Sequence, residues 1–491
     1  MNYKMVLNVL GRAMLIEAAL LIIPLLVGVS FGENTYISFL IPMAGLFLVG
    51  VPLSLLKFRD KSIYAKEGFV IVALAWIVLS VVGCLPFIIS GEIPNFFDAF
   101  FETASGFTTT GASALDSVEY LSRSIMFWRI LTHWLGGMGV LVFVLAILPS
   151  AGAGIMYVFR AESPGPSAGK LVGKIKHTAQ ILYGIYVILT VSEAVLLLIG
   201  GMPLYDAVLN AFSTAGTGGF GVHDGSIAYY NNVYYEMVIA VFMFLFGINF
   251  NIFYLILTGN VLKALKSEEL MVYVGMILTA SIVIALNILG ITMNILDRVE
   301  TVGNFWQALR YSFFQVNTIT STTGFSTADF AEWPALSKGI LLFLTVIGAS
   351  GGSTGGGMKV ARLCILRRSA TANLRRMIYP RSVVSVKFEG KTISRETERG
   401  VLTYFILYVA IVCLCTLLLS LDSFADVFTN FSATLACISN VGPGITKLIG
   451  PMASYAGYAW YSKLILSFVM LAGRLEIFPI ILLLAPRTWK K

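Results

Sequence analysis

The chain has 491 residues, of which 57% are hydrophobic and only 12% charged, and its formal net charge is +8 at pH 7. Because an ordinary soluble chain carries about 25% charged residues, this composition excludes a soluble enzyme and predicts an all-α polytopic membrane protein. The five cysteines lie mostly in apolar runs without metal-ligand spacing, and the lysines and arginines gather in particular loops, so we expect neither a metal cofactor nor a nucleic-acid partner.

Ten apolar segments long enough to cross a bilayer follow one another along the chain. They are expected at residues 8–30, 36–56, 68–90, 122–148, 178–200, 232–261, 271–292, 336–361, 400–421 and 456–485. Most lysines and arginines fall in the loops at 57–67, 160–176, 263–269 and 359–399, which the positive-inside rule places in the cytoplasm together with both termini. The opposite loops are acidic, which attracts cations to that face, and contain Asp98, Glu102, Asp116, Asp206, Asp224, Asp329, Glu332, Asp422 and Asp426.

Four outer loops share one pattern. Each starts with a helical stretch of about 10–16 residues and ends in small polar residues, as in "FDAFFETASGFTTTGAS", "YDAVLNAFSTAGTGGFG", "WQALRYSFFQVNTITSTTGFS" and "FADVFTNFSATLACISNVGPG". The endings share a glycine, at Gly111, Gly219, Gly324 and Gly442, with spacings of 108, 105 and 118 residues. The chain therefore contains four repeats of helix, re-entrant helix, polar loop and helix. We place the two leading spans at 1–60 and the repeats at 61–160, 161–266, 267–390 and 391–491.

A helix of about 10–16 residues cannot cross a hydrocarbon core of about 30 Å, so each loop must enter the membrane and return. Non-helical backbone is tolerated at that depth only inside protein or beside water, and four such loops in a pseudo-fourfold arrangement make one pore. Stripping a cation of water costs on the order of tens of kcal/mol unless oxygens replace the lost shell. Backbone carbonyls and hydroxyls supply such oxygens, and the four endings contain no charged side chain.

A second polar interruption occurs in the eighth span, where "GASGGSTGGGMK" occupies residues 348–359. Because each Gly costs a helix roughly 1 kcal/mol relative to Ala, we expect this run to open into a loop at membrane depth. A phosphate-binding loop is the alternative, but Lys359 follows Met358 rather than the last Gly, and no strand precedes the run.

Three further features combine charge with an apolar setting. Arg474 lies near the middle of the last apolar segment, where an ionisable group usually faces the bundle interior or water, and Glu476 is expected on a different helix face. His133 in "HWLGGMGV" is expected to serve close helix packing through the glycines that follow it. The Arg-rich stretch 362–391 carries one acid, Glu389, and either enforces the membrane topology and contacts anionic lipid or receives a push from a cytosolic partner.

Several motifs, "ASGFTTTGAS", "STTGF", "SNVGPG", "HWLGGMGV", "FRAESPGP", "GGSTGGGMK" and "LAGRLEIFP", closely resemble the Trk/Ktr/HKT superfamily of potassium transporters, in its bacterial TrkH-type branch. The resemblance covers essentially the whole chain and implies a potassium uptake channel or transporter of the inner membrane, not an enzyme. It also implies that the Gly-rich loop is an intramembrane gate with a pore-facing Arg beside it, formed by Gly348, Gly351, Gly352, Ser353, Thr354, Gly355, Gly356, Gly357, Lys359 and Arg474.

The resemblance further places a filter for the transported K⁺ on four residues of each repeat. These are Thr109, Thr110, Gly111 and Ala112; Thr217, Gly218, Gly219 and Phe220; Thr322, Thr323, Gly324 and Phe325; and Asn440, Val441, Gly442 and Pro443. Each segment keeps one central Gly of the longer potassium-channel signature, so selectivity is expected to be looser than in a channel. The second segment departs most from the Thr-rich pattern.

The partners implied by the resemblance are a second copy of the chain in a homodimer, membrane lipids, and a cytoplasmic ring of TrkA-type regulatory subunits. A nucleotide is expected on that ring and not on this chain. A sodium-coupled Ktr-like symporter is the alternative within the family, and the sequence leaves open whether H⁺ or Na⁺ is coupled to transport. A polytopic membrane enzyme is the alternative from another class, but the outer acids form no catalytic motif and a fourfold repeat has no purpose there.

Overall fold

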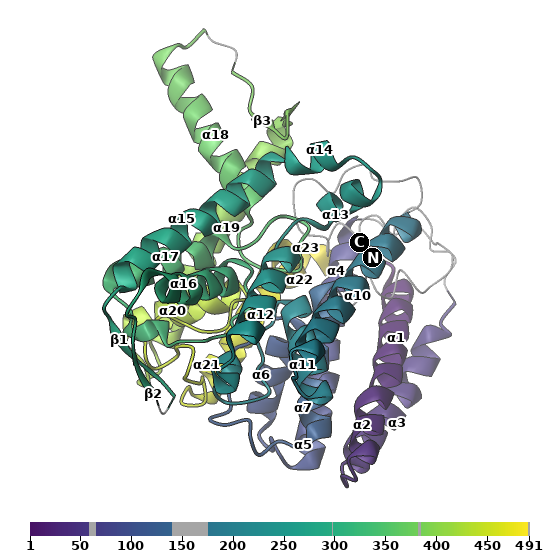
Figure 1. Ribbon diagram of the computed structural model, residues 1–491. Helices are drawn as coiled ribbons and strands as arrows, with labels where there is room; N and C mark the ends of the chain where they lie inside the picture. Colours follow the sequence, from purple (N-terminus) through teal and green to yellow (C-terminus); the bar gives the residue numbers. More distant parts are fainter. Residues whose placement is uncertain (58–64, 140–174, 297, 382–383, 490–491) are drawn as a thin grey trace.

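A computed structural model describes residues 1–57, 65–139, 175–296, 298–381 and 384–489, and this part of the chain is mostly helical (Figure 1). Within it, six helices are long and apolar enough to cross a membrane, and the bent pair α12–α13 makes a seventh if it is taken as one span. The predicted all-α polytopic membrane fold is confirmed.

The leading helices are α1 (Tyr3–Leu20), α2 (Ile22–Ser30) and α3 (Tyr36–Ser54). α3 packs against α1, and the approach is close because Gly11 has no side chain: a Cβ there would lie 2.6 Å from the Cβ of Leu53. The Tyr3 hydroxyl donates to the Trp489 carbonyl at 3.0 Å, so the two chain ends lie side by side.

The remaining chain runs four times through a long helix, a short helix, a polar segment and a closing helix. The long helices are α4 (Ala65–Gly83), which α5 (Leu85–Ser90) continues, α10 (Ile175–Ile199), α15 (Glu268–Ile288) and α19 (Arg395–Leu419). The short helices are α6 (Phe96–Phe107), α11 (Leu204–Gly216), α16 (Phe305–Thr320) and α20 (Val427–Ile438). The closing helices are α7 (Arg123–Gly137), α12 (Val233–Phe246), α17 (Ala335–Ile347) and α21 (Trp460–Arg474).

The short helices begin at local capping signals. The side chains of Asn95, Asn304 and Asp426 accept hydrogen bonds from backbone N–H groups in the first turns of α6, α16 and α20, and Pro203 precedes α11. The helices span 12, 13, 16 and 12 residues, as the sequence predicts for re-entrant segments.

Each short helix packs against the closing helix of its own repeat and against that of another repeat. α11 contacts α7, α16 contacts α12, and α20 contacts α17. α6 of the first repeat contacts α21 of the last, so the contacts close into a ring. The predicted filter segments, which follow the short helices, are therefore positioned by helices of neighbouring repeats.

The predicted continuous spans at 232–261 and 456–485 are wrong. α12 ends at Phe246, and α13 (Phe250–Leu257) leaves at 88°. Gly247 lies at this break. A Cβ there would overlap the Tyr273 hydroxyl, so the absence of a side chain lets Tyr273 pack closely against the break. The Gly247 carbonyl also accepts a hydrogen bond from Ser350 N at 3.1 Å. α21 ends at Arg474, and positive φ angles at Glu476 (57°) and Ile477 (69°) separate it from α22 (Phe478–Leu484).

Arg474 is thus the last residue of a helix and not the middle of one. The predicted interruption of the eighth span is confirmed, since α17 ends at Ile347 and the loop 348–359 follows. The closing helices hold 15, 14, 13 and 15 residues, or about 20–23 Å at 1.5 Å per residue, and so all stop short of a full crossing.

The remaining elements are loops and surface helices. α14 (Val261–Leu265) and α18 (Val360–Ile378) lie on the side that carries the chain ends, and α18 projects away from the body (Figure 1). Two antiparallel hairpins occur, β1 (Thr292–Ile295) with β2 (Arg298–Thr301) and β3 (Lys387–Phe388) with β4 (Lys391–Thr392). The short elements are η1 (Ser226–Tyr230), η2 (Phe330–Glu332) and α23 (Pro486–Trp489). The repeat boundaries near 60 and 160, the span beyond residue 139 and most of the basic loop 160–176 lie outside the described residues.

Candidate functional site

The four polar endings share one backbone conformation. A residue one or two positions after each short helix is in the left-handed region, at Thr109 (φ 55°), Thr217 (54°), Thr322 (63°) and Asn440 (55°). Two positions later each segment has its glycine, again with positive φ, between 78° and 93°. β-Branched threonine rarely adopts such angles, so three of the four segments store strain at the same position. The second segment, which matches the sequence pattern least, has the same geometry as the others.

The four glycines meet in a ring. A Cβ added to Gly111 would overlap the carbonyl oxygen of Gly218, and one on Gly219 that of Thr323. In the same way a Cβ on Gly324 would overlap the carbonyl oxygen of Val441, and one on Gly442 would lie 2.5 Å from that of Thr110. Each segment therefore presses on the next, and the last presses on the first. No side chain larger than hydrogen fits at these four positions.

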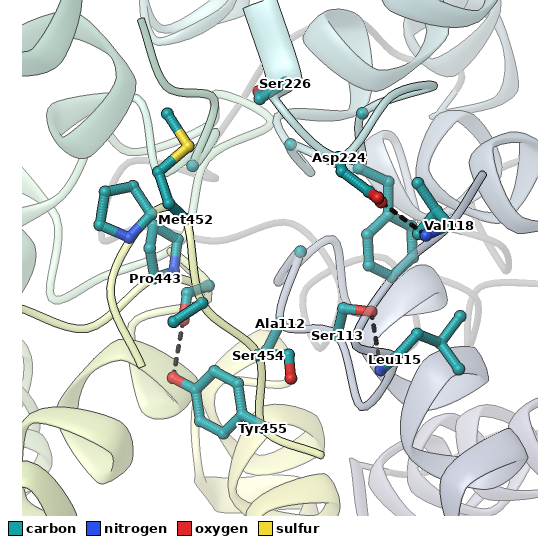
Figure 2. Close-up of a pocket in the computed structure, with 18 of the residues that line it drawn as sticks. Ala112, Ser113, Leu115, Val118, Asp224, Ser226, Pro443, Met452, Ser454 and Tyr455 are labelled. Carbon is teal, nitrogen blue, oxygen red and sulfur yellow. Dashed lines mark hydrogen bonds between the residues drawn. The ribbon is translucent and has the colours of Figure 1, made fainter. Parts of the chain in front are cut away.

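One cavity of about 290 Å³ opens directly onto this ring, and all four glycines line it. Figure 2 shows Pro443 and Met452 on one side of the cavity and Asp224 and Val118 on the other. The segments that frame it are tied together, since Tyr455 OH donates to the Gly442 carbonyl at 2.8 Å and Val118 N donates to Asp224 at 2.6 Å. The cavity is the vestibule of the ring.

Most hydroxyl groups of the segments are engaged with the scaffold, whereas the buried Thr109 Oγ1 has no hydrogen-bond partner among the described residues. Thr110 Oγ1 accepts from Asn440 Nδ2 at 2.9 Å and lies 2.8 Å from Thr108 Oγ1. Thr323 Oγ1 lies 2.7 Å from Ser321 Oγ, and Thr322 Oγ1 accepts from Gly356 N at 2.6 Å. The sequence predicts that these hydroxyls share in coordinating the ion, and the structure gives the hydroxyls of Thr110, Thr322 and Thr323 contacts within the protein.

Of the nine outer acids, Asp116 and Asp224 line the vestibule. Both also fix loops, because Asp116 accepts from Ser454 Oγ at 2.9 Å and Asp224 accepts from Ser117 Oγ at 2.7 Å. Asp329, predicted to gather cations just outside the filter, does not line the cavity and instead caps η2 through Ala331 N. Most of the other acids likewise hold loops and helix ends.

His223 stands at the rim of the vestibule. Its ring stacks on Tyr229 with centroids 3.7 Å apart, and its Nδ1 and Nε2 lie 3.2 Å from Glu119 and 3.6 Å from Asp206. Burial alone would lower the pKa of His223, but hydrogen bonds to the Asp206 and Glu119 carboxylates raise it, and the net pKa is above its usual value.

A buried ion pair supports the first two segments from behind. Glu102 Oε2 lies 2.8 Å from Arg129 Nε, and both side chains are almost fully buried. Glu102 Oε1 accepts from Ser113 Oγ at 2.7 Å and from Ala114 N at 2.6 Å, directly after the first segment. The Arg129 guanidinium lies 3.4 Å from the centre of the Phe220 ring in the second segment.

The "HWLGGMGV" motif packs tightly, as predicted. The His133 ring is buried and stacks on Phe220 with centroids 4.1 Å apart, and a Cβ on Gly136 would overlap the carbonyl of Phe107. A Cβ on Gly137 would lie 2.7 Å from the Cα of Gly216. These glycines let α7 approach the ends of α6 and α11.

The Gly-rich loop 348–359 lies against the inner side of the segments. Besides the bond from Gly356 N to Thr322, Gly355 and Gly356 stand close to the carbonyls of Ser321 and Ser439. The loop is anchored on α15, where Glu269 accepts from Gly351 N at 2.6 Å. The predicted gate residues are therefore brought together directly below the ring.

Arg474 clamps this loop. Its Nη1 donates to the Thr354 carbonyl at 2.6 Å, and its Nη2 donates to the carbonyls of Gly136 and Gly137 at 2.5 and 2.7 Å. Lys359 Nζ, which is also buried, donates to the Gly355 carbonyl. Glu476 pairs with Arg362 at 2.5 Å, in agreement with the prediction that it does not pair with Arg474.

Sequence reasoning missed Glu102 as a support, the Arg362–Glu476 pair and the breaks after α12 and α21. The sequence predicts Glu102 as an outer-loop acid, although its position within the helical part of the loop pattern is a signal for burial. The breaks carried a weaker signal, a Gly at position 247 and another at 473.

Comparison with known proteins agrees with this architecture. Residues 40–491 match the TrkH family model, described as a cation transport protein. The chain is 35% identical to the Trk system potassium uptake protein TrkH of Salmonella typhimurium, with both chains covered completely, and 32% identical to TrkG of Escherichia coli over 95% of this chain and 94% of that one. The crystal structure of the potassium transporter TrkH from Vibrio parahaemolyticus superposes with a TM-score of 0.87 at 30% identity over all of both chains. This chain belongs to the TrkH family of cation transport proteins.

Proposed function

We propose that this chain is the potassium-conducting pore of an uptake system in the inner membrane. The observation that carries the proposal is the ring of four glycine-centred segments that opens onto one vestibule. Glycine at each position lets a neighbouring carbonyl approach the centre, where a side chain would otherwise stand. The names of the relatives, Trk system potassium uptake proteins, support K⁺ as the ion.

In this proposal K⁺ exchanges its water shell for backbone carbonyls of the sixteen predicted filter residues. The short helices direct the negative ends of their dipoles toward the ring, because each filter segment follows a helix C-terminus. The threonine and asparagine side chains hold neighbouring segments at fixed separation, as the Asn440–Thr110 bond does. With one glycine per segment, Rb⁺ is expected to pass and Na⁺ to be rejected less completely than in a potassium channel.

The gate in this proposal is the loop 348–359 with Arg474 and Lys359. Both cationic side chains donate to carbonyls of the loop, which lies directly below the ring. There, their charge and the loop backbone oppose the passage of a cation. Opening requires the loop to leave its contacts with Thr322 and Arg474. Since α18 starts immediately after the loop, movement of α18 is the direct route to the gate.

We further propose that both termini are cytoplasmic, that two copies of the chain form a dimer, and that a TrkA-type cytosolic ring that binds nucleotide acts on α18. The chain ends and α18 lie on one side of the molecule, which supports this arrangement (Figure 1).

The test is uptake of ⁸⁶Rb⁺ by the purified chain in liposomes, with no organic substrate and with no cytosolic subunit. We expect uptake that K⁺ inhibits at lower concentration than Na⁺, and that imposed H⁺ or Na⁺ gradients do not drive. Uptake that depends on a Na⁺ gradient would instead establish a symporter, and the absence of ion flux under all gradients would refute the pore.

A further inference from the structure

We infer that α18, where it faces the β3–β4 hairpin, carries a binding site for the phosphate of an anionic phospholipid headgroup. A second cavity, of about 480 Å³, lies between α18, the β3–β4 hairpin and the start of α15. Its lining includes four cationic side chains and one carboxylate, namely Arg367, Arg368, Arg375, Lys387 and Glu268. It is distinct from the filter vestibule and from the gate contacts.

The cavity has a built frame. Arg368 Nη2 lies 2.5 Å from Glu268 Oε1, and its Nη1 donates to the Lys387 carbonyl at 2.5 Å, so this one arginine joins all three walls. Glu389 at the hairpin turn accepts from Ser267 Oγ at 2.8 Å and from Glu269 N at 3.0 Å, which fixes the hairpin on α15. Both carboxylates of the frame, Glu268 and Glu389, therefore have their partners within the frame.

Three cations remain for a ligand. Among the described residues, the side chains of Arg367, Arg375 and Lys387 have neither a hydrogen bond nor an ion pair, and all three are exposed. Arg367 and Arg375 stand eight residues apart on one face of α18, with Thr371 between them. Planar guanidinium groups of this kind bind phosphate in a bidentate manner.

The depth of the cavity selects a lipid. Glu268 is the first residue of α15, one of the helices long and apolar enough to cross a membrane, and Arg395, which opens another such helix, α19, follows β4 by three residues. Because the cavity floor is where a span enters the hydrocarbon, its cations lie at the level of the phospholipid phosphates. Because the anions present at this depth are lipid phosphates, a lipid headgroup is favoured over a soluble anion. Three free charges favour a headgroup that carries more than one phosphate, as diphosphatidylglycerol does.

The functional consequence rests on the proposed gate. α18 is continuous with loop 348–359, so a headgroup that bridges Arg367, Arg375 and Lys387 fixes α18 to the hairpin and thereby restrains the loop. The binding itself is measurable without ion flux, so failure of the lipid site and failure of the potassium pore are distinguishable.

The experiment is native mass spectrometry of the full chain released from mixed vesicles of phosphatidylcholine and diphosphatidylglycerol. The test variant is Arg367→Gln/Arg375→Gln/Lys387→Gln, and the matched control is Lys263→Gln/Lys266→Gln, which removes two exposed cations on the same side, one in α14 and one directly after it. Each cation near an anionic headgroup contributes roughly fivefold in affinity, so we expect on the order of 100-fold weaker retention of diphosphatidylglycerol in the triple variant. The control should retain the lipid as the wild type does.

Three outcomes would overturn the proposal. The first is equal lipid retention in the triple variant and the wild type, with both folded by thermal unfolding. The second is displacement of the lipid by millimolar inorganic phosphate or pyrophosphate, which would make the ligand a soluble phosphate. The third is unchanged lipid retention together with lost binding of the cytosolic regulatory subunit, which would make this surface a protein contact.

Discussion

Arg129 Nε lies 2.8 Å from Glu102 Oε2, and this buried pair joins two neighbouring segments of the proposed filter. Glu102 holds the chain that leaves the first segment, and Arg129 lies on the Phe220 ring of the second. The charge-assisted bond between Glu102 and Arg129 therefore fixes the distance between the two segments.

Glu102→Gln should destabilise the protein and weaken ion selection. The substitution leaves the Arg129 charge buried without its partner, which costs about 3–5 kcal/mol of unfolding free energy. We expect a lower thermal unfolding temperature in detergent and a smaller preference for Rb⁺ over Na⁺ in liposomes. Glu102→Gln/Arg129→Met removes both charges and should recover most of the stability but not the selectivity. Wild-type selectivity in the double variant would reduce the pair to a purely structural role.

Arg474→Gln should open the gate. It removes the charge-assisted hydrogen bonds to Thr354, Gly136 and Gly137, so basal ⁸⁶Rb⁺ flux should rise roughly tenfold or more. Arg474→Lys keeps the charge but loses the guanidinium fork, and we expect it to leak as well. Arg395→Gln, an exposed arginine at the start of α19, is the control and should keep the basal flux. If the basal flux of Arg474→Lys is as low as that of the wild type, the positive charge, and not the set of guanidinium hydrogen bonds, closes the pore.

Thr322→Val should uncouple the filter from the gate loop. The Thr322 hydroxyl is the acceptor for Gly356 N, and its loss leaves a buried N–H unpaired at about 1–3 kcal/mol. Basal flux should therefore rise, by roughly five- to tenfold. Thr322→Ser keeps the hydroxyl and should behave as the wild type. Equal flux in the two variants would argue that the bond contributes nothing to closure.

His223 should make uptake depend on external pH. Its pKa is raised by the Asp206 and Glu119 carboxylates, so the ring is protonated below a pH somewhat above 6.5 and neutral above it. Protonation adds a positive charge at the rim, which opposes a cation by less than the roughly 1 kcal/mol of two charges 4 Å apart in water, and so by about twofold in entry. We expect uptake to fall about twofold as external pH falls through this range. In His223→Gln the profile should be flat, and a pH dependence that survives the substitution would assign it to another group.

Much of the fold could be predicted from the sequence because it repeats. One polar ending such as "STTGF" is equally consistent with a capped turn, but four at near-constant spacing define four equivalent segments, and the structure gives them equivalent φ angles even at Thr217, where the letters differ most. The Gly-rich interruption after Ile347 was predictable for a similar reason, since helix propensity alone excludes a continuous helix there.

The supports of the site could not be predicted, because they depend on pairings between distant parts of the chain. Arg129 is 27 residues from Glu102, and Arg474 is 120 residues from Thr354. Hydrophobic periodicity does not specify such contacts. The break after α12 could not be predicted either, because the apolar run from 232 to 261 has the pattern of one span. The break depends on two distant residues: the Tyr273 hydroxyl packs against Gly247, and Ser350 N donates to the Gly247 carbonyl.

The central claim is tested most directly by the ion selectivity of Gly324→Ser in liposomes. Gly324 has φ +88°, and a Cβ there would overlap the Val441 carbonyl, so a serine displaces the fourth segment from the ring. We predict that the folded variant loses its preference for K⁺ and Rb⁺ over Na⁺, measured as competition against ⁸⁶Rb⁺ uptake. Gly339→Ser, on α17 with open space around the added Cβ, should keep that preference. A Gly324→Ser protein with wild-type selectivity would contradict the assignment of this ring as the filter.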